Sequence, residues 1–132
     1  MTDKVEFELV SPERLLVSKP VDMVVVPGAE GDFGVLRGHA PLISTLRLGV
    51  IDIHDEGGVT ERIFVAGGFA EVTGERCTVL AEEAIALGDL KRTDIEADIR
   101  TLKDRLAVAD NDAERIALAG RIEIADAKLA LV

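Results

Sequence analysis

The chain has 132 residues, with 15 Lys and Arg against 25 Asp and Glu, which gives a formal net charge of −10 at pH 7. This charge argues against nucleic acid and against anionic lipid headgroups as partners, because both are bound by clustered Lys and Arg. Hydrophobic residues make up 48% of the chain and aromatic residues only 3%, so the length allows one domain or two small ones with cores of Val, Ile, Leu and Ala.

Residues up to about 84 are predicted to form short β-strands separated by turns. Val5, Phe7 and Leu9 alternate with glutamates, as in a strand with one buried face. The apolar run 23–26 is typical of a strand that is covered on both faces. Further strands are predicted at 50–53, 60–65, 69–73 and 77–81, the first two joined in one hairpin and the last two in another. Turn signals at this spacing indicate a β-sandwich or a barrel.

The glycine-rich stretch 27–42 is the most distinctive part of the chain. Gly28, Gly31 and Gly34 recur at every third position, and glycine permits backbone conformations and close approaches that other residues do not. We therefore expect a shaped surface loop between strands. The stretch offers few groups for catalysis: Glu30, Asp32, Arg37 and His39. Such a loop is better suited to docking than to an active site.

From about residue 89 the apolar residues follow a helical period. Thr93 and Glu96 have the spacing of a capping box, which predicts the start of a first helix. One apolar stripe then runs along that helix: Ile95, Ile99, Leu102 and Leu106. Asn111 is suited to a left-handed conformation and Asp112 to the N-cap of a second helix, which is predicted to run to near the C-terminus.

The second helix carries two adjacent stripes. The first is made mostly of small residues: Ala113, Ala117, Gly120, Ile124 and Ala127. The second is bulkier: Leu118, Ile122, Ala125, Leu129 and Val132. Because small residues permit close helix–helix approach, the first stripe is expected to face the first helix, and the bulky stripe then needs a further partner. The alternative is that both stripes form one wide face against the β-domain.

The sequence shows no constellation of catalytic or metal-binding residues. The histidines, His39 and His54, lie in different segments, and neither has a Cys or His at metal-ligand spacing. The phosphate-binding patterns G-x-G-x-x-G and G-x-x-x-x-G-K-[ST] do not occur. The neighbouring carboxylates Glu82 and Glu83 are expected on a solvated surface. We therefore predict no catalytic residue and no metal site.

The compartment is predicted from the N-terminus, the apolar runs and the cysteine. No apolar run approaches the roughly 18 residues that cross a bilayer, and the first residues carry charges where a signal peptide needs apolar side chains. The single Cys77 excludes an internal disulfide and suits a reducing compartment. Its strand-like neighbours predict a packed rather than a reactive thiol. These features indicate a cytosolic protein.

The segments 27–42, 63–72 and 78–81, in this order, resemble the ε subunit of bacterial F-type ATP synthases. The resemblance covers nearly the whole chain and is most specific in the first two segments. It implies a flattened N-terminal β-sandwich at 1–86 followed by an antiparallel α-helical hairpin at 87–132, in agreement with the two periodicities.

The resemblance also implies a function without catalysis. Family members belong to the rotor, or central stalk, where they bind the γ subunit and rest on the ring of c subunits, so that proton flow is coupled to ATP synthesis. The expected location is the cytoplasmic face of the cell inner membrane, with membrane contact only through the complex. In several members the helices extend along γ toward the α and β subunits and inhibit ATP hydrolysis; whether that happens here is left open.

In this chain, the loop that resembles the family's contact with the c-ring consists of Glu30, Gly31 and Asp32. His39 lies in the family's interface-forming region, so the resemblance implies a contact at a subunit boundary. The alternative is a loop histidine whose ring nitrogens satisfy nearby backbone groups. The predicted interface with γ and the c-ring therefore comprises these four residues.

Some family members bind ATP through the motif I/L-D-x-x-R-A. In the segment 88–93 of this chain, Asp89 and Arg92 match that motif, but Gly88 and Thr93 depart from it. The alternative is a carboxylate at a helix start and a surface cation. No cofactor is expected, and ATP as a regulatory ligand is left open. The competing function for the chain is a stand-alone nucleotide-binding protein that uses these two residues.

Overall fold

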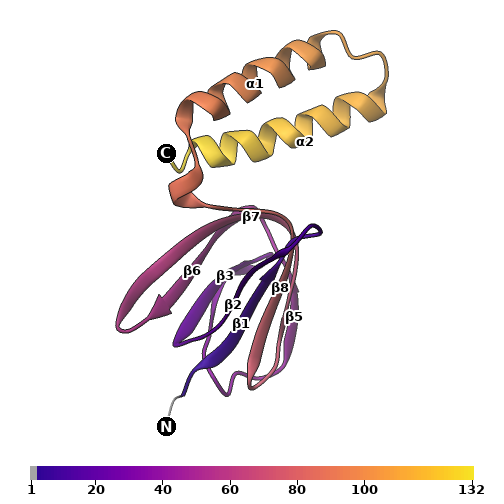
Figure 1. Ribbon diagram of the computed structural model, residues 1–132. Coiled ribbons are helices and arrows are strands. Elements are labelled where there is room, and N and C mark those ends of the chain that lie inside the picture. Colours follow the sequence, from indigo (N-terminus) through magenta and orange to yellow (C-terminus); the bar gives the residue numbers. More distant parts are fainter. Residues whose placement is uncertain (1–2) are drawn as a thin grey trace. The chain divides into compact units, whose positions relative to one another are not determined.

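The computed structural model describes residues 3–132, and the chain divides into two compact units between Ala86 and Leu87. The first unit is a β-sandwich and the second is a pair of helices (Figure 1). The predicted fold class is therefore confirmed. The strands are β1 (Val5–Val10), β2 (Leu15–Val21), β3 (Met23–Gly28), β4 (Gly31–Val35), β5 (Leu42–Thr45), β6 (Gly49–Asp55), β7 (Gly58–Val72) and β8 (Arg76–Ala86).

The strands form one continuous sheet that is folded over on itself. Their hydrogen-bonded order is β2-β1-β8-β7-β6-β3-β4, and β5 pairs separately with β7. Every pairing is antiparallel except that of β1 with β8. The strands β4 and β5 thus lie at edges of the sheet, where backbone groups and side chains are available to a neighbour.

The long strand β7 contributes to both layers of the sandwich, because its pairing partner changes at Gly67 and Gly68. Residues 58–65 pair with β6, whereas residues 69–72 pair with β5. Both glycines have positive φ, 74° and 106°, a region that other residues rarely adopt. The prediction of two separate strands at 60–65 and 69–73 was wrong, because these glycines bend a single strand that stays paired with β8 on both sides of the bend.

The core of the sandwich is formed by alternate residues of the strands. Phe7, Leu9, Ile51 and Ile53 are fully buried, together with many valines. The period-2 pattern at Val5, Phe7 and Leu9 is therefore confirmed. No buried side-chain polar atom within residues 3–132 lacks a hydrogen-bond partner. Within residues 3–132 no polar or charged residue is buried, and the core is mostly aliphatic, as the low aromatic content predicts.

Cys77 lies in this core, as predicted for a packed thiol. Its side chain is fully buried on β8, where it pairs with Val72 on one side and Phe7 on the other. Burial raises the pKa of the Cys77 thiol to about 12, because the thiolate would lose its hydration. The thiol is therefore protonated at neutral pH and does not act as a nucleophile.

The second unit contains a short 3-10 helix η1 (Leu87–Asp89) and the α-helices α1 (Arg92–Ala107) and α2 (Asp112–Leu129). The predicted capping box is wrong: the N-cap of α1 is Lys91, which makes no side-chain cap hydrogen bond. The N-cap of α2 is Asn111 rather than Asp112, with an extended backbone and with Oδ1 accepting from the Glu114 N–H at 2.8 Å. Asparagine and aspartate both cap well, so their order could not be resolved from residue type.

The helices pack through a small apolar core. Its buried members come from both helices: Ile95, Ile99, Leu102, Leu118 and Ala125. The predicted stripe of α1 is thus confirmed, but the predicted orientation of α2 is wrong. Leu118 and Ala125 of the bulky stripe are buried, whereas Ala117 and Gly120 of the small stripe are exposed. Burying the larger side chains removes more apolar area from water, which outweighs the closer approach that small residues allow.

Candidate interaction surface

Only residues 36–41 of the glycine-rich stretch form the predicted loop between strands, whereas residues 27–35 form the end of a hairpin. The strands β3 and β4 pair from Val24 with Val35 to Gly28 with Gly31, and Ala29 and Glu30 make the turn. Gly31 has a φ of 134°, which favours glycine at the point where the chain enters β4. The glycine spacing could not reveal the hairpin, because glycine is common both in loops and in turns between short strands.

The tip of this hairpin is attached to residues 45–47, at the end of β5 and in the segment that leads to β6. The Ala29 N–H donates to the carbonyl of Thr45 at 2.9 Å, and Gly28 bridges to Leu46. Arg47 adds a side-chain contact: Nη1 donates to the Gly28 carbonyl at 2.7 Å, and Nη2 donates to Oδ1 of Asp32. The tip is therefore an exposed but anchored surface. Of the predicted contact residues, Glu30, Gly31 and Asp32 lie together here.

An open groove separates the edge strands β4 and β5 beside the tip. It has a volume of about 520 Å³ and is lined by Ala29, Glu30, Gly31, Asp32, Phe33, Leu42, Ile43, Ser44 and Thr45. Ile43 is 70% exposed. Exposed aliphatic side chains beside carboxylates form a mixed surface of the kind found at protein–protein contacts.

His39 lies in the connection between β4 and β5. Its ring is 6.4 Å from that of Phe33, measured between centroids, and its Nδ1 is 2.7 Å from the carbonyl of Ala40. The adjoining Gly38 N–H donates to the Gly74 carbonyl in the β7–β8 turn at 2.6 Å. His39 thus makes the local backbone contact expected of a loop histidine, and Phe33 connects it to the strand that carries Asp32.

Asp89 and Arg92 occupy the start of the helical unit, the first in η1 and the second at the first turn of α1. The guanidinium Nη2 of Arg92 donates to the carbonyl of Val132 at 2.7 Å. This contact joins the start of α1 to the far end of α2. Arg92 therefore makes a contact inside the hairpin.

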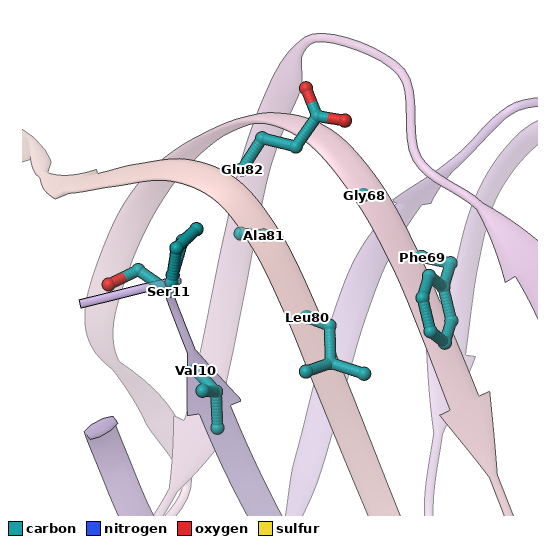
Figure 2. Close-up of a pocket in the computed structure, with 8 residues that line it drawn as sticks. Val10, Ser11, Gly68, Phe69, Leu80, Ala81 and Glu82 are labelled. Carbon is teal, nitrogen blue, oxygen red and sulfur yellow. The ribbon is translucent and has the colours of Figure 1, made fainter. Parts of the chain in front are cut away.

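A further exposed surface was not identified from the sequence. Val10, Leu80 and Phe69 lie side by side on β1, β8 and β7 (Figure 2), and Leu80 is the register partner of both others. Leu80 and Phe69 are each 39% exposed. They line a depression of about 420 Å³ whose exposed surface is mostly apolar. The sequence did contain a signal for this surface. Thr78, Leu80 and Glu82 are the residues of β8 that alternate with buried ones, and Leu80 is the apolar residue among them.

The described residues contain neither a cluster of metal-binding side chains nor a membrane-spanning helix. Within residues 3–132, no group of three or more His, Cys, Asp or Glu side chains is arranged to hold a metal ion. No described helix combines the length and the apolar character needed to cross a membrane.

Comparison with known proteins gives matches over the whole chain. Residues 4–87 match the family described as ATP synthase, Delta/Epsilon chain, beta-sandwich domain. The chain is 57% identical to the ATP synthase epsilon chain of Rhodospirillum centenum, with 100% of this chain and 94% of the relative covered. It is 58% identical to that of Paramagnetospirillum magneticum, covering 100% and 99%.

Solved structures share the fold at lower identity. A chain in the mitochondrial ATP synthase of Euglena gracilis, solved with OSCP, F1 and c-ring, matches with a TM-score of 0.79 at 23% identity, covering 98% of this chain and 82% of that one. A chain in the central stalk and c-ring of the Tetrahymena thermophila mitochondrial ATP synthase matches with a TM-score of 0.65 at 16% identity, covering 96% of both.

Proposed function

The chain belongs to the family of ATP synthase epsilon chains, and we propose that it is a non-catalytic subunit of the central stalk of a proton-translocating ATP synthase. In this role it links the γ subunit to the c-ring, so that proton flow is coupled to ATP synthesis. Its place is peripheral, at the cytoplasmic face of the inner membrane, and it meets the membrane only through the complex.

The observation that carries the proposal is the match to epsilon chains along the full length, through both the sandwich and the helices. A shared sandwich alone would allow a module borrowed for another purpose. Identity of 57–58% across both units supports the same role in the same assembly. The competing function, a stand-alone nucleotide-binding protein, has less support, because Arg92 is engaged by the Val132 carbonyl.

Two exposed surfaces supply the contacts that this role requires. The hairpin tip at Glu30, Gly31 and Asp32 is assigned to the polar loops of the c-ring, because it is a small, anchored, acidic projection. The apolar depression around Phe69 and Leu80 is assigned to the γ subunit. Exposed apolar patches of this kind mark contacts with protein partners. A subunit of the rotor needs a stable contact with γ.

Affinity purification from membranes tests the proposal. The tagged chain is expected to bring down γ together with the α and β subunits. Replacing Leu80 by glutamate in the apolar depression should reduce that recovery, because a charge would have to be buried in the contact. The matched control is Ile116→Glu, at a 73% exposed residue on α2. This variant should still bind γ. Recovery of the chain alone, with a bound nucleotide, would overturn the proposal.

A further inference from the structure

The two helices of the second unit run antiparallel, so the start of each lies beside the end of the other (Figure 1). The carbonyl end of a helix carries a partial negative charge, and its start carries a partial positive charge. An arginine in the first turn is therefore unfavourable for its own helix. The same arginine is well placed to donate to the carbonyl groups at the end of the neighbouring helix, which lack partners within that helix.

Both ends of the hairpin have an arginine in this position. Arg92 is the first residue of α1, and its Nη2 donates to the carbonyl of Val132, beyond the end of α2, at 2.7 Å. Arg115 lies in the first turn of α2, and its Nη2 donates to the carbonyl of Ala109, beyond the end of α1, at 3.2 Å. Each helix thus supplies a side-chain donor to the carbonyl end of the other.

The two ends differ in what else holds the helices together. At the loop end the chain itself joins them, and Arg115 Nη1 also donates to Oδ1 of Asp112 at 2.8 Å. At the open end, which comprises the start of α1 and the end of α2, Leu90 and Leu129 pack against the apolar core but are only partly buried. Arg92 adds its hydrogen bond across this end. The open end therefore depends on side-chain contacts to stay closed.

The position of Arg92 also bears on nucleotide binding. The segment 88–93 departs from the ATP-binding motif at Gly88 and Thr93. In the structure Asp89 lies in η1, and the guanidinium of Arg92 is directed to a backbone carbonyl of its own chain. A phosphate group at Arg92 would compete with that carbonyl for the Nη2 donor. The residues present thus fit closure by the protein's own groups better than closure by a nucleotide.

We propose that the helical hairpin is closed by its own arginines, Arg92 at the open end and Arg115 at the loop end, so that the closed form needs no bound nucleotide. Arg92 is then a latch within the chain and not a ligand for phosphate. The inference concerns the helical unit by itself, and it stands whether or not the proposed function is correct.

The latch is tested in the purified full chain by hydrogen exchange of the Ala130 amide, which donates to the Asp126 carbonyl at 3.1 Å at the end of α2. Arg92→Ala is expected to speed this exchange about twofold to fivefold, as follows from the loss of one exposed hydrogen bond. Arg92→Lys should retain part of the protection. An effect of Arg92 on α1 alone would leave Ala130, near the other helix end, unchanged, and that result would overturn the latch.

Arg115→Ala is the matched control, because it removes the same kind of contact at the loop end. It should speed exchange of the Ala109 amide, which donates to the Leu106 carbonyl at 3.3 Å, and leave Ala130 at the wild-type rate. Equally fast Ala130 exchange in both variants would show that the hairpin loosens as a whole. That result would contradict the assignment of the open end to Arg92.

Nucleotide independence is tested by adding ATP with Mg²⁺ in excess to the same chain. The proposal predicts the same Ala130 exchange rate with and without ATP, and no heat of binding in titration calorimetry. Slower Ala130 exchange with ATP would show that the nucleotide contributes to closure and would overturn the proposal. Loss of that protection in Arg92→Ala would then assign the phosphate contact to this arginine.

Discussion

Replacing Gly68 by alanine is expected to lower the free energy of unfolding of the β-sandwich by about 3 kcal/mol or more. A Cβ at this position would lie 1.9 Å from the carbonyl oxygen of Leu80 and 2.9 Å from the Cα of Ala81. Both are backbone atoms of β8, so the clash can be relieved only by moving a paired strand. The φ of 106° adds strain for any residue with a side chain.

The measurement is urea unfolding of the chain, followed by the signals of core residues such as Phe7. Gly58→Ala is the matched control on the same strand: a Cβ there meets nothing within 4 Å. That variant should change the free energy of unfolding by no more than about 0.5 kcal/mol. Equal stability of the two variants would show that β7 does not bend at Gly68 as described.

Leu118→Ala is the second change with a large expected effect, a loss of about 2–5 kcal/mol from the helical hairpin. Leu118 is 3% exposed and belongs to a core with only four other buried residues. A core of that size gives the helices only a small free energy of unfolding, because a module of fewer than about 50 residues buries little apolar surface. The helices are therefore expected to lose their stable pairing while the sandwich stays folded.

Amide hydrogen exchange resolved by residue checks this result, since it reports on each unit separately. Ile116→Ala serves as the control, because Ile116 is 73% exposed two residues away on the same helix. Faster exchange in α1 and α2 with unchanged exchange in the strands is expected for Leu118→Ala alone. If Ala117→Leu destabilises the pairing instead, the small stripe faces α1 after all.

Local patterns in the sequence predict much of this fold. The alternation at Val5, Phe7 and Leu9 and the stripe that includes Ile95 and Ile99 follow from the periods of a strand and a helix. The continuity of β7 does not, because a pair of glycines signals an interruption as readily as a bend. Whether the glycine pair interrupts or bends the strand depends on β8, whose backbone approaches Gly68 too closely for any residue with a side chain.

The candidate site was predicted in part. The exposed turn at Glu30 lies in the stretch that the sequence marks as distinctive, so its place could be found. Arg47 could not, because its partners Gly28 and Asp32 are 19 and 15 residues away along the chain. Contacts between such distant residues depend on strand order, which local periodicity does not encode. The same holds for the apolar row of Phe69 and Leu80, which exists only once β7 and β8 pair.

Restoration of coupling tests the central claim most directly. An ATP synthase complex that lacks this chain is reconstituted in vesicles, and ATP-driven proton pumping is measured before and after addition of the purified chain. The rotor role predicts little pumping without the chain and recovery upon stoichiometric addition, since in the proposed role the chain would supply the link between γ and the c-ring. Equal pumping with and without the chain would contradict the account.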